Sequence, residues 1–127
     1  MTRTSQALAI VAMFLSSALA VEAMAASVRV TCEKRSNRAK ISVDGRSLAA
    51  GEYTTEAISG GNLAAAGPVT AVRGQVETDY DSNPADIADG ATPIAPNFIE
   101  GGRVTGKVID ASGFTVAEGT AVCRVKR

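Results

Sequence analysis

The chain has 127 residues, with 13 Lys or Arg balanced by 13 Asp or Glu, and it contains two Cys and no His. Without His and with only two Cys, neither a zinc site nor a Cys–His nucleophile can be assembled. His is also the commonest general base at neutral pH. Carboxylates remain at Glu77, Asp79 and Asp81, but alternate positions of an exposed strand provide no desolvation to raise a pKa. We therefore expect the protein not to be an enzyme.

The N-terminus has the three parts of a secretory signal peptide. A basic start, Met1–Arg3, precedes an uncharged and mostly apolar run of 14 residues, Ala7–Ala20, and the small-residue pattern Ala23–Ala25 follows it. A membrane-spanning helix needs roughly 20 apolar residues, although an uncleaved anchor or a buried helix are the alternatives. We expect residues 1–25 to be cleaved, leaving a periplasmic or secreted domain of residues 26–127 with no membrane span.

Both cysteines, Cys32 and Cys123, follow the expected cleavage site. Two cysteines in a small exported domain most often pair, because the compartment is oxidising. The bridge would close a loop of about 90 residues and stabilise the fold by about 4–5 kcal/mol on the chain-entropy model. Free thiols, or a bond to another chain, are the alternatives.

The first half of the mature chain has the period-two alternation of half-buried strands. Apolar and polar residues alternate over 28–33 and again over 39–43, with a turn expected at Ser36-Asn37. Asp44-Gly45 is a dipeptide that favours a tight hairpin turn, so we expect the second strand to end there.

Further strands are expected downstream. The run 52–59 begins after a glycine and alternates, the stretch 63–72 is weakly patterned and fits a loop or a poor edge strand, and 75–80 alternates again. After an irregular segment over 91–99, strands are expected at 103–110 and at 114–125, with a bulge at Gly119.

A short helix is expected at 84–89. Asn83 suits the N-cap position and Pro84 the first helical position, while Gly90 suits the residue after the helix end.

Six or seven short strands, with turn signals every eight to twelve residues, predict an all-β fold: a small antiparallel β-sandwich with one short helix. Cys32 falls on the first strand and Cys123 on the last, both in the inward register. Their bridge would fasten the terminal strands to each other or across the sandwich, and both geometries remain open at this point.

Two resemblances follow from these motifs. The segment VTGKVIDASGFTV, residues 104–116, resembles the strand–turn–strand unit of bacterial immunoglobulin-like and carboxypeptidase-regulatory-type modules. The wider pattern over 32–38, 41–45, 79–84 and 101–106 resembles small exported bacterial proteins of unassigned function. These resemblances imply an exported, immunoglobulin-like β domain and supply no catalytic residue.

The acidic stretch 79–89 is a candidate calcium site, because oxygen ligands at alternate positions begin many calcium loops. The pattern departs from that loop at Pro84, where a glycine is needed, and at Gly90, where a bidentate Glu belongs. The alternative is that these side chains lie on a strand surface and cap the helix. The candidate metal ligands are Asp79, Asp81, Asn83 and Asp86.

Charge is distributed as basic, acidic and basic segments. Residues 28–46 have a net charge of +4, residues 52–100 of −7 and residues 103–127 of +3. A basic cluster near the two ends would suit anionic envelope components, and unlike segments could also pair between copies. Aromatic residues make up only 4% of the chain, which makes nucleic acid an unlikely partner. A solvated, salt-bridged surface is the alternative. The candidate residues for an anionic partner are Lys34, Arg35, Arg38, Arg124 and Lys126.

The sequence therefore predicts an exported, non-catalytic binding or structural module of the bacterial cell envelope or extracellular space. It is expected to need no cofactor. The alternative function is a calcium-dependent β module that uses the acidic region 79–89.

Overall fold

Nine strands and one short helix form the part of the chain that the computed structural model describes, residues 25–127. The expected leader lies outside this part, apart from Ala25. Within it, no helix is long and apolar enough to cross a membrane. The elements in chain order are β1 (Ser27–Arg35), β2 (Arg38–Arg46), β3 (Glu52–Ser59), β4 (Asn62–Thr70), β5 (Val76–Asp81), α2 (Pro84–Ala88), β6 (Thr92–Pro93), β7 (Arg103–Asp110), β8 (Thr115–Val122) and β9 (Arg124–Val125).

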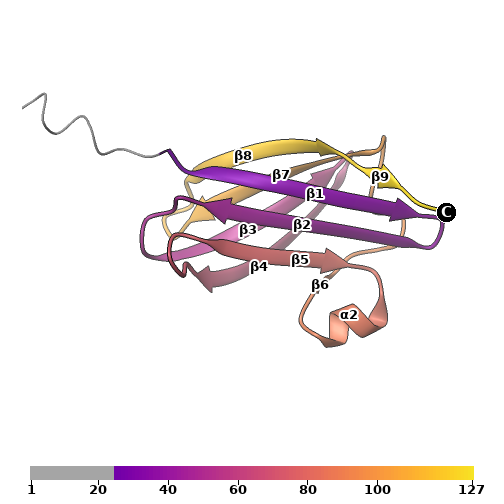
Figure 1. The fold of residues 1–127 in the computed structure, drawn as a ribbon, viewed down its shortest axis with the longest axis horizontal. Helices are drawn as coiled ribbons and strands as arrows, with labels where there is room; N and C mark the ends of the chain where they lie inside the picture. Colours follow the sequence, from indigo (N-terminus) through magenta and orange to yellow (C-terminus); the bar gives the residue numbers. More distant parts are fainter. Residues whose placement is uncertain (1–24) are drawn as a thin grey trace, which may run out of the picture.

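The strands form two sheets that pack face to face (Figure 1). One sheet has five strands in the order β6-β5-β2-β1-β9, and the other has four in the order β4-β3-β7-β8. The expectation of a two-sheet, mostly β fold with one short helix is thus confirmed. The expectation of purely antiparallel pairing is wrong, because β6 runs parallel to β5 and β9 runs parallel to β1. Only the four-stranded sheet is antiparallel throughout.

The core lies between the inner faces of the two sheets. Alternate residues of each strand point inward, as the period of two requires, and Ile41, Val43 and Tyr80 of one sheet meet Val104 and Val108 of the other with no exposed surface. The hydrophobic effect at this interface is the main stabilising contribution. The crossing segment after β6 closes one end of the core with three buried side chains, Ile94, Phe98 and Ile99.

Three hydroxyl groups lie inside this apolar layer. Thr55 Oγ1 of β3 is 2.7 Å from Thr78 Oγ1 and 2.6 Å from the Tyr80 hydroxyl, both on β5. Thr78 donates in turn to the Val43 carbonyl at 3.1 Å. Burial raises the pKa of the Tyr80 hydroxyl. Since a buried hydroxyl is costly unless it is hydrogen-bonded, the network favours one alignment of the two sheets.

A pair of glycines allows the first strand to pack closely onto the opposite sheet. Gly106 of β7 pairs with Gly119 of β8. A Cβ atom on Gly106 would lie 2.6 Å from Val30 Cγ2 and 3.1 Å from Val43 Cγ2, and one on Gly119 would lie 3.2 Å from Val28 Cγ1. Both positions therefore accommodate glycine, whereas the side chain of any larger residue would be too close to the valines of β1 and β2.

Two expectations about glycine positions, Gly119 and Gly45, are wrong. The bulge predicted at Gly119 lies elsewhere, because the register shifts between Val108 and Ile109 instead. The turn predicted at Asp44-Gly45 is absent among the described elements, because β2 continues through Arg46. A Cβ on Gly45 would lie 3.0 Å from Leu48 Cδ1, so this glycine serves close packing rather than a turn.

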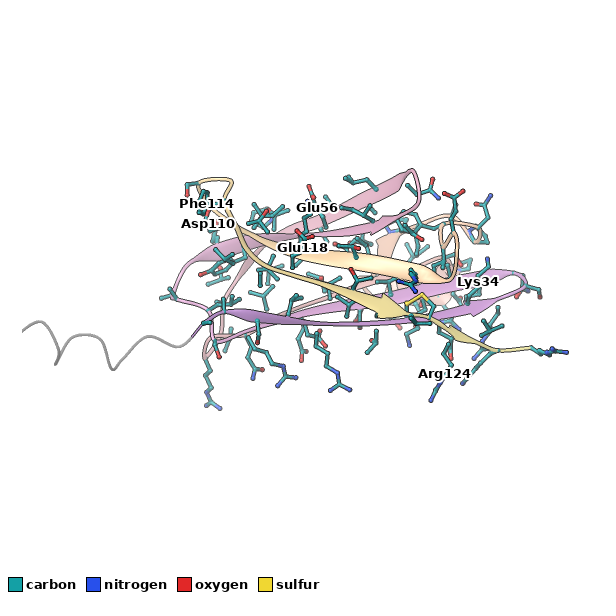
Figure 2. All side chains as sticks on the ribbon, turned by 90° about the horizontal axis from the view of Figure 1, so that it is seen from above. Lys34, Glu56, Asp110, Phe114, Glu118 and Arg124 are labelled. Carbon is teal, nitrogen blue, oxygen red and sulfur yellow. A yellow bond between two sulfur atoms is a disulfide. The ribbon has the colours of Figure 1, made fainter. Side chains whose placement is uncertain are left out.

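The predicted disulfide is confirmed and lies where the chain changes sheets. Cys123 falls between β8, in the four-stranded sheet, and β9, in the five-stranded sheet. Its sulfur is bonded to Cys32 on β1 at 2.00 Å, across a sequence separation of 91, and the bond is visible in Figure 2. The bridge thus fixes the crossover between the sheets onto the first strand.

Replacing Gly106 with Ala is expected to destabilise the protein by about 1–3 kcal/mol, because the added methyl group overpacks the core against Val30 and Val43. The measurement is urea unfolding of the oxidised protein. The matched control is Gly61→Ala, since nothing lies within 4 Å of a Cβ built there. Equal unfolding free energies for the two variants would contradict the close packing of β1 on β7.

Candidate functional site

Four of the five predicted anion-binding residues meet at one edge of the five-stranded sheet. The strand β9 pairs with β1 in the register Glu33↔Arg124 and Lys34↔Val125. The Lys126 amide then donates to the Lys34 carbonyl at 2.9 Å. Figure 2 shows Lys34 and Arg124 near the disulfide, on opposite faces of the sheet. We call this group the basic edge; it consists of Lys34, Arg35, Arg124 and Lys126.

One carboxylate lies within the basic edge. Glu33 is 3.1 Å from Lys126 Nζ and 3.6 Å from a guanidinium nitrogen of Arg35. The hydrogen bond from Lys126 lowers the pKa of Glu33, so this carboxylate stays ionised. Glu33 offsets one of the three positive charges on this outer face, those of Arg35, Arg124 and Lys126, so a net charge of +2 remains there. Lys34 lies on the opposite face of β1, in the register of Cys32.

A groove of about 430 Å³ adjoins the basic edge. The strand β1 forms one wall and the end of β8, with the start of β9, forms the other. Val122 at its rim is 74% exposed, and Val125 nearby is 73% exposed, so apolar surface lies next to the cations. The groove is lined by apolar Val122, by the cations Lys40 and Arg124 and by the carboxylate Glu33.

Arg38, the fifth predicted residue, lies away from the basic edge and contacts carboxylates of its own chain. Its Nε is 3.0 Å from Asp81 Oδ1, and one terminal nitrogen is 2.8 Å from Asp81 Oδ2 and 2.9 Å from Asp86 Oδ2. The guanidinium therefore binds two carboxylates of its own chain. The bidentate geometry to Asp81 is the strongest form of such a pair.

Asp81 is buried, with only 2% of its side chain exposed. Burial by itself would raise the pKa of the carboxyl, but the Arg38 hydrogen bond and the amides of Asn83 and Ser82 outweigh it and hold the pKa below its usual value. Asp81 is thus an ionised group whose charge is balanced inside the protein.

The predicted calcium ligands are divided among different contacts. Asp79 accepts a hydrogen bond from Ser42 on the outer face of the sheet. Asn83 caps α2 by accepting from the Ala85 amide at 3.0 Å, as expected from the sequence. Asp81 and Asp86 share the Arg38 guanidinium. Over residues 25–127, no group of three or more Cys, Asp or Glu is placed to hold a metal ion. Asp79 on the strand surface and Asn83 at the helix cap fit the alternative interpretation, whereas Asp81 is buried and Asp86 binds Arg38.

An acidic groove lies at the other edge of the five-stranded sheet. It has a volume of about 360 Å³ and is bounded by β4, by β5 and by the turn after α2. Burial raises the pKa of neighbouring Asp44, and the charges of Glu77 and Asp79 add to this effect. Negative charge is therefore in excess here. We call the side chains Glu77, Asp79 and Asp89 the acidic edge.

No family model, curated protein or solved structure matches this chain. The function is therefore inferred from the geometry of the molecule itself. That geometry offers two charged edges, each with a groove, on opposite sides of one sheet.

Replacing Arg38 with Ala is expected to lower the midpoint of thermal unfolding at pH 7 by about 10 °C, because Asp81 is left buried and ionised without its partner. The matched control is Arg103→Ala, which removes an exposed cation. The double variant Arg38→Ala/Asp81→Ala should recover part of the loss.

The same pair predicts a pH dependence. Because the pKa of Asp81 is held below its unfolded value, its stabilising contribution is present above about pH 4 and disappears as the pH falls through the folded pKa. The difference between wild type and Arg38→Ala should therefore shrink in acid. A difference that is constant from pH 7 to pH 2 would contradict this assignment.

Calcium is expected to leave the thermal midpoint unchanged, since the acidic side chains are already engaged with Arg38, Ser42 and the helix end. The measurement compares melts in excess calcium and in EDTA. A bound ligand at about a hundred times its dissociation constant would add about 2.7 kcal/mol. A shift of several degrees that is lost in Asp79→Asn would restore the calcium interpretation.

Proposed function

We propose that the protein is an exported, non-catalytic binding module with an immunoglobulin-like β-sandwich, whose basic edge binds an anionic component of the bacterial cell envelope. The observation that carries this proposal is the parallel pairing of β9 with β1. It places two C-terminal cations, Arg124 and Lys126, beside two from the first strand, although about 90 residues separate them in sequence.

Export is supported by two independent features. The signal-peptide pattern of residues 1–25 predicts it from the sequence. The disulfide between Cys32 and Cys123 fits an oxidising compartment, where such bonds form and persist. The immunoglobulin-like character is supported by the two packed sheets and by the 104–116 segment, which forms β7, a turn and the start of β8.

The surroundings of the cations favour a phosphate-bearing amphiphile as the partner. Exposed Val122 and Val125 lie beside Arg124, so the surface offers apolar contact next to positive charge. Anionic phospholipid and lipopolysaccharide both combine phosphate with apolar chains. Each Lys or Arg near such a surface contributes about 1 kcal/mol, and the attraction weakens with salt. Base stacking needs aromatic platforms, and aromatic residues make up only 4% of this chain.

The test is sedimentation of the oxidised protein with vesicles of phosphatidylglycerol and with vesicles of neutral phosphatidylcholine. We expect binding to the anionic vesicles only. The bound fraction should fall steeply between about 50 and about 500 mM salt, because salt screens the attraction between surface charges. The variant Arg124→Ser/Lys126→Ser should bind roughly 30-fold more weakly, since two cations are lost.

The matched control is Arg103→Ser/Lys107→Ser, which removes two cations from the outer face of the four-stranded sheet. It should bind as wild type does. Equal losses in the two variants would show that only net charge matters, and equal binding to both kinds of vesicle would remove the electrostatic basis. Either result contradicts the proposal.

A further inference from the structure

The outer edge of β5 follows from the way this strand pairs with β2. The Ser82 amide, just after β5, donates to the Ala39 carbonyl at 3.1 Å. Main-chain groups of an antiparallel strand point alternately toward and away from the neighbouring strand. The even-numbered residues of β5 therefore bond to β2, and its odd-numbered residues, Glu77, Asp79 and Asp81, direct their N–H and C=O groups outward.

The strand β6 covers only the end of this outer edge. It pairs with Tyr80 and Asp81, and the Ile94 amide just after it donates to the Asp81 carbonyl at 3.0 Å. In the described part of the chain, no strand pairs with the outward N–H and C=O of Glu77 or with the outward N–H of Asp79. Unpaired groups of this kind can accept a further strand.

The acidic groove of about 360 Å³ lies along the same edge and leaves it accessible. One wall is β5, with Glu77 and Asp79 exposed. The other wall is β4, which contributes the small or apolar residues Ala66, Gly67 and Val69. An extended segment in this groove would lie beside the unpaired main-chain groups of β5.

Negative charge is in excess around the groove. Its lining contains five carboxylates and one cation, Lys40. The Arg38 guanidinium binds two of these carboxylates. Five negative charges against these two cations leave a net charge of −3. Burial raises the pKa of neighbouring Asp44, and the charges of Glu77 and Asp79 add to this effect, as expected for negative charge that is not fully balanced.

We propose that this edge binds an extended basic peptide of another protein, which adds to β5 as a further strand of the sheet. Main-chain hydrogen bonds give such a complex its affinity, and alternate side chains give it specificity. Side chains of a strand alternate between the two faces of a sheet. Lys or Arg at every second position of the peptide would therefore face Glu77 and Asp79, and small apolar residues between them would face β4.

A second copy of this chain does not offer such a segment. Its strand β1 is flanked by β8, because Gly119 lies against Val28, and its strand β9 is already paired with β1. In β4, Pro68 has no N–H to donate and the strand contains no cation. The partner is therefore another polypeptide. The inference goes beyond the proposed function, in which the acidic edge takes no part.

The experiment is an NMR titration of the oxidised protein with the peptide Lys-Val-Lys-Val-Lys, blocked at both ends. We expect hydrogen exchange of the Glu77 and Asp79 amides to slow in the complex, because these N–H groups gain acceptors. Exchange of the Thr78 amide, which already bonds to β2, should change little. Unchanged exchange at Glu77 and Asp79 up to millimolar peptide overturns the proposal. Slowing that follows protein concentration without peptide would assign the edge to a second copy and also overturns it.

Two substitutions of Glu77 separate charge from main-chain bonding. Glu77→Gln removes one charge and keeps the outward N–H, so it should weaken binding roughly threefold, the size of one cross-strand charge pair. Glu77→Pro also removes the N–H, which pairing with β2 does not use. It should weaken binding roughly fivefold more, because a main-chain hydrogen bond is lost. Equal affinities of the two variants overturn the proposal, because strand addition requires that N–H.

The matched control is Glu118→Gln, which removes an exposed carboxylate from the four-stranded sheet and should bind the peptide as wild type does. The peptide Glu-Val-Glu-Val-Glu should not bind, and equal binding of it overturns the selection by charge. Circular dichroism verifies that each variant is folded. If Glu77→Pro is unfolded, the alternating exchange pattern of the wild-type complex provides the test.

This proposal and the proposed function can fail separately. The basic-edge variant Arg124→Ser/Lys126→Ser should bind the basic peptide as wild type does. Glu77→Gln should bind anionic vesicles as wild type does. Loss of peptide binding in the basic-edge variant overturns the assignment to β5.

Discussion

The covalent link between Cys32 and Cys123 holds the last strand of the chain against the first. At Cys123 the chain leaves one sheet and enters the other, and the bond holds this crossover against the first strand. Only two residue pairs connect β9 to β1, which is little hydrogen bonding for a strand. The disulfide therefore supplies the constraint that keeps Arg124 and Lys126 beside Lys34. The position of the last strand and of its cations Arg124 and Lys126 depends on it.

Much of the fold could be predicted from the alternation of residues, because each strand buries one face. The helix was also predictable, since Asn83 and Pro84 are typical of a helix start. The parallel additions β6 and β9 could not be predicted, because two-residue strands leave no periodic pattern. The turn expected at Asp44-Gly45 shows a second limit. The sequence alone does not distinguish a glycine that permits close packing from a glycine that permits a turn.

The candidate site was predictable in part. The disulfide expected from the sequence is confirmed, and β9 pairs with β1 beside it, at Glu33 and Lys34. The role of Arg38 was not foreseen, because its partner Asp81 lies 43 residues away and the alternation places that aspartate on an outer face. Asp81 is nevertheless buried, since the helix and β6 follow directly after it. A carboxylate two residues before a helix N-cap, here Asp81 before Asn83, is the one sequence signal that could have indicated this burial.

The buried hydroxyls have a consequence for where their protons lie. Thr78 has one proton and donates it to the Val43 carbonyl, so in its contact with Thr55 it can only accept. Thr55 must then donate to Thr78, and its remaining contact is filled by the proton of Tyr80. All three O–H bonds thus point the same way, from Tyr80 through Thr55 and Thr78 to the backbone. The core of this small sandwich therefore contains a chain of hydrogen bonds with a single donor-to-acceptor direction, and the hydroxyl of neutral Tyr80 is its first donor.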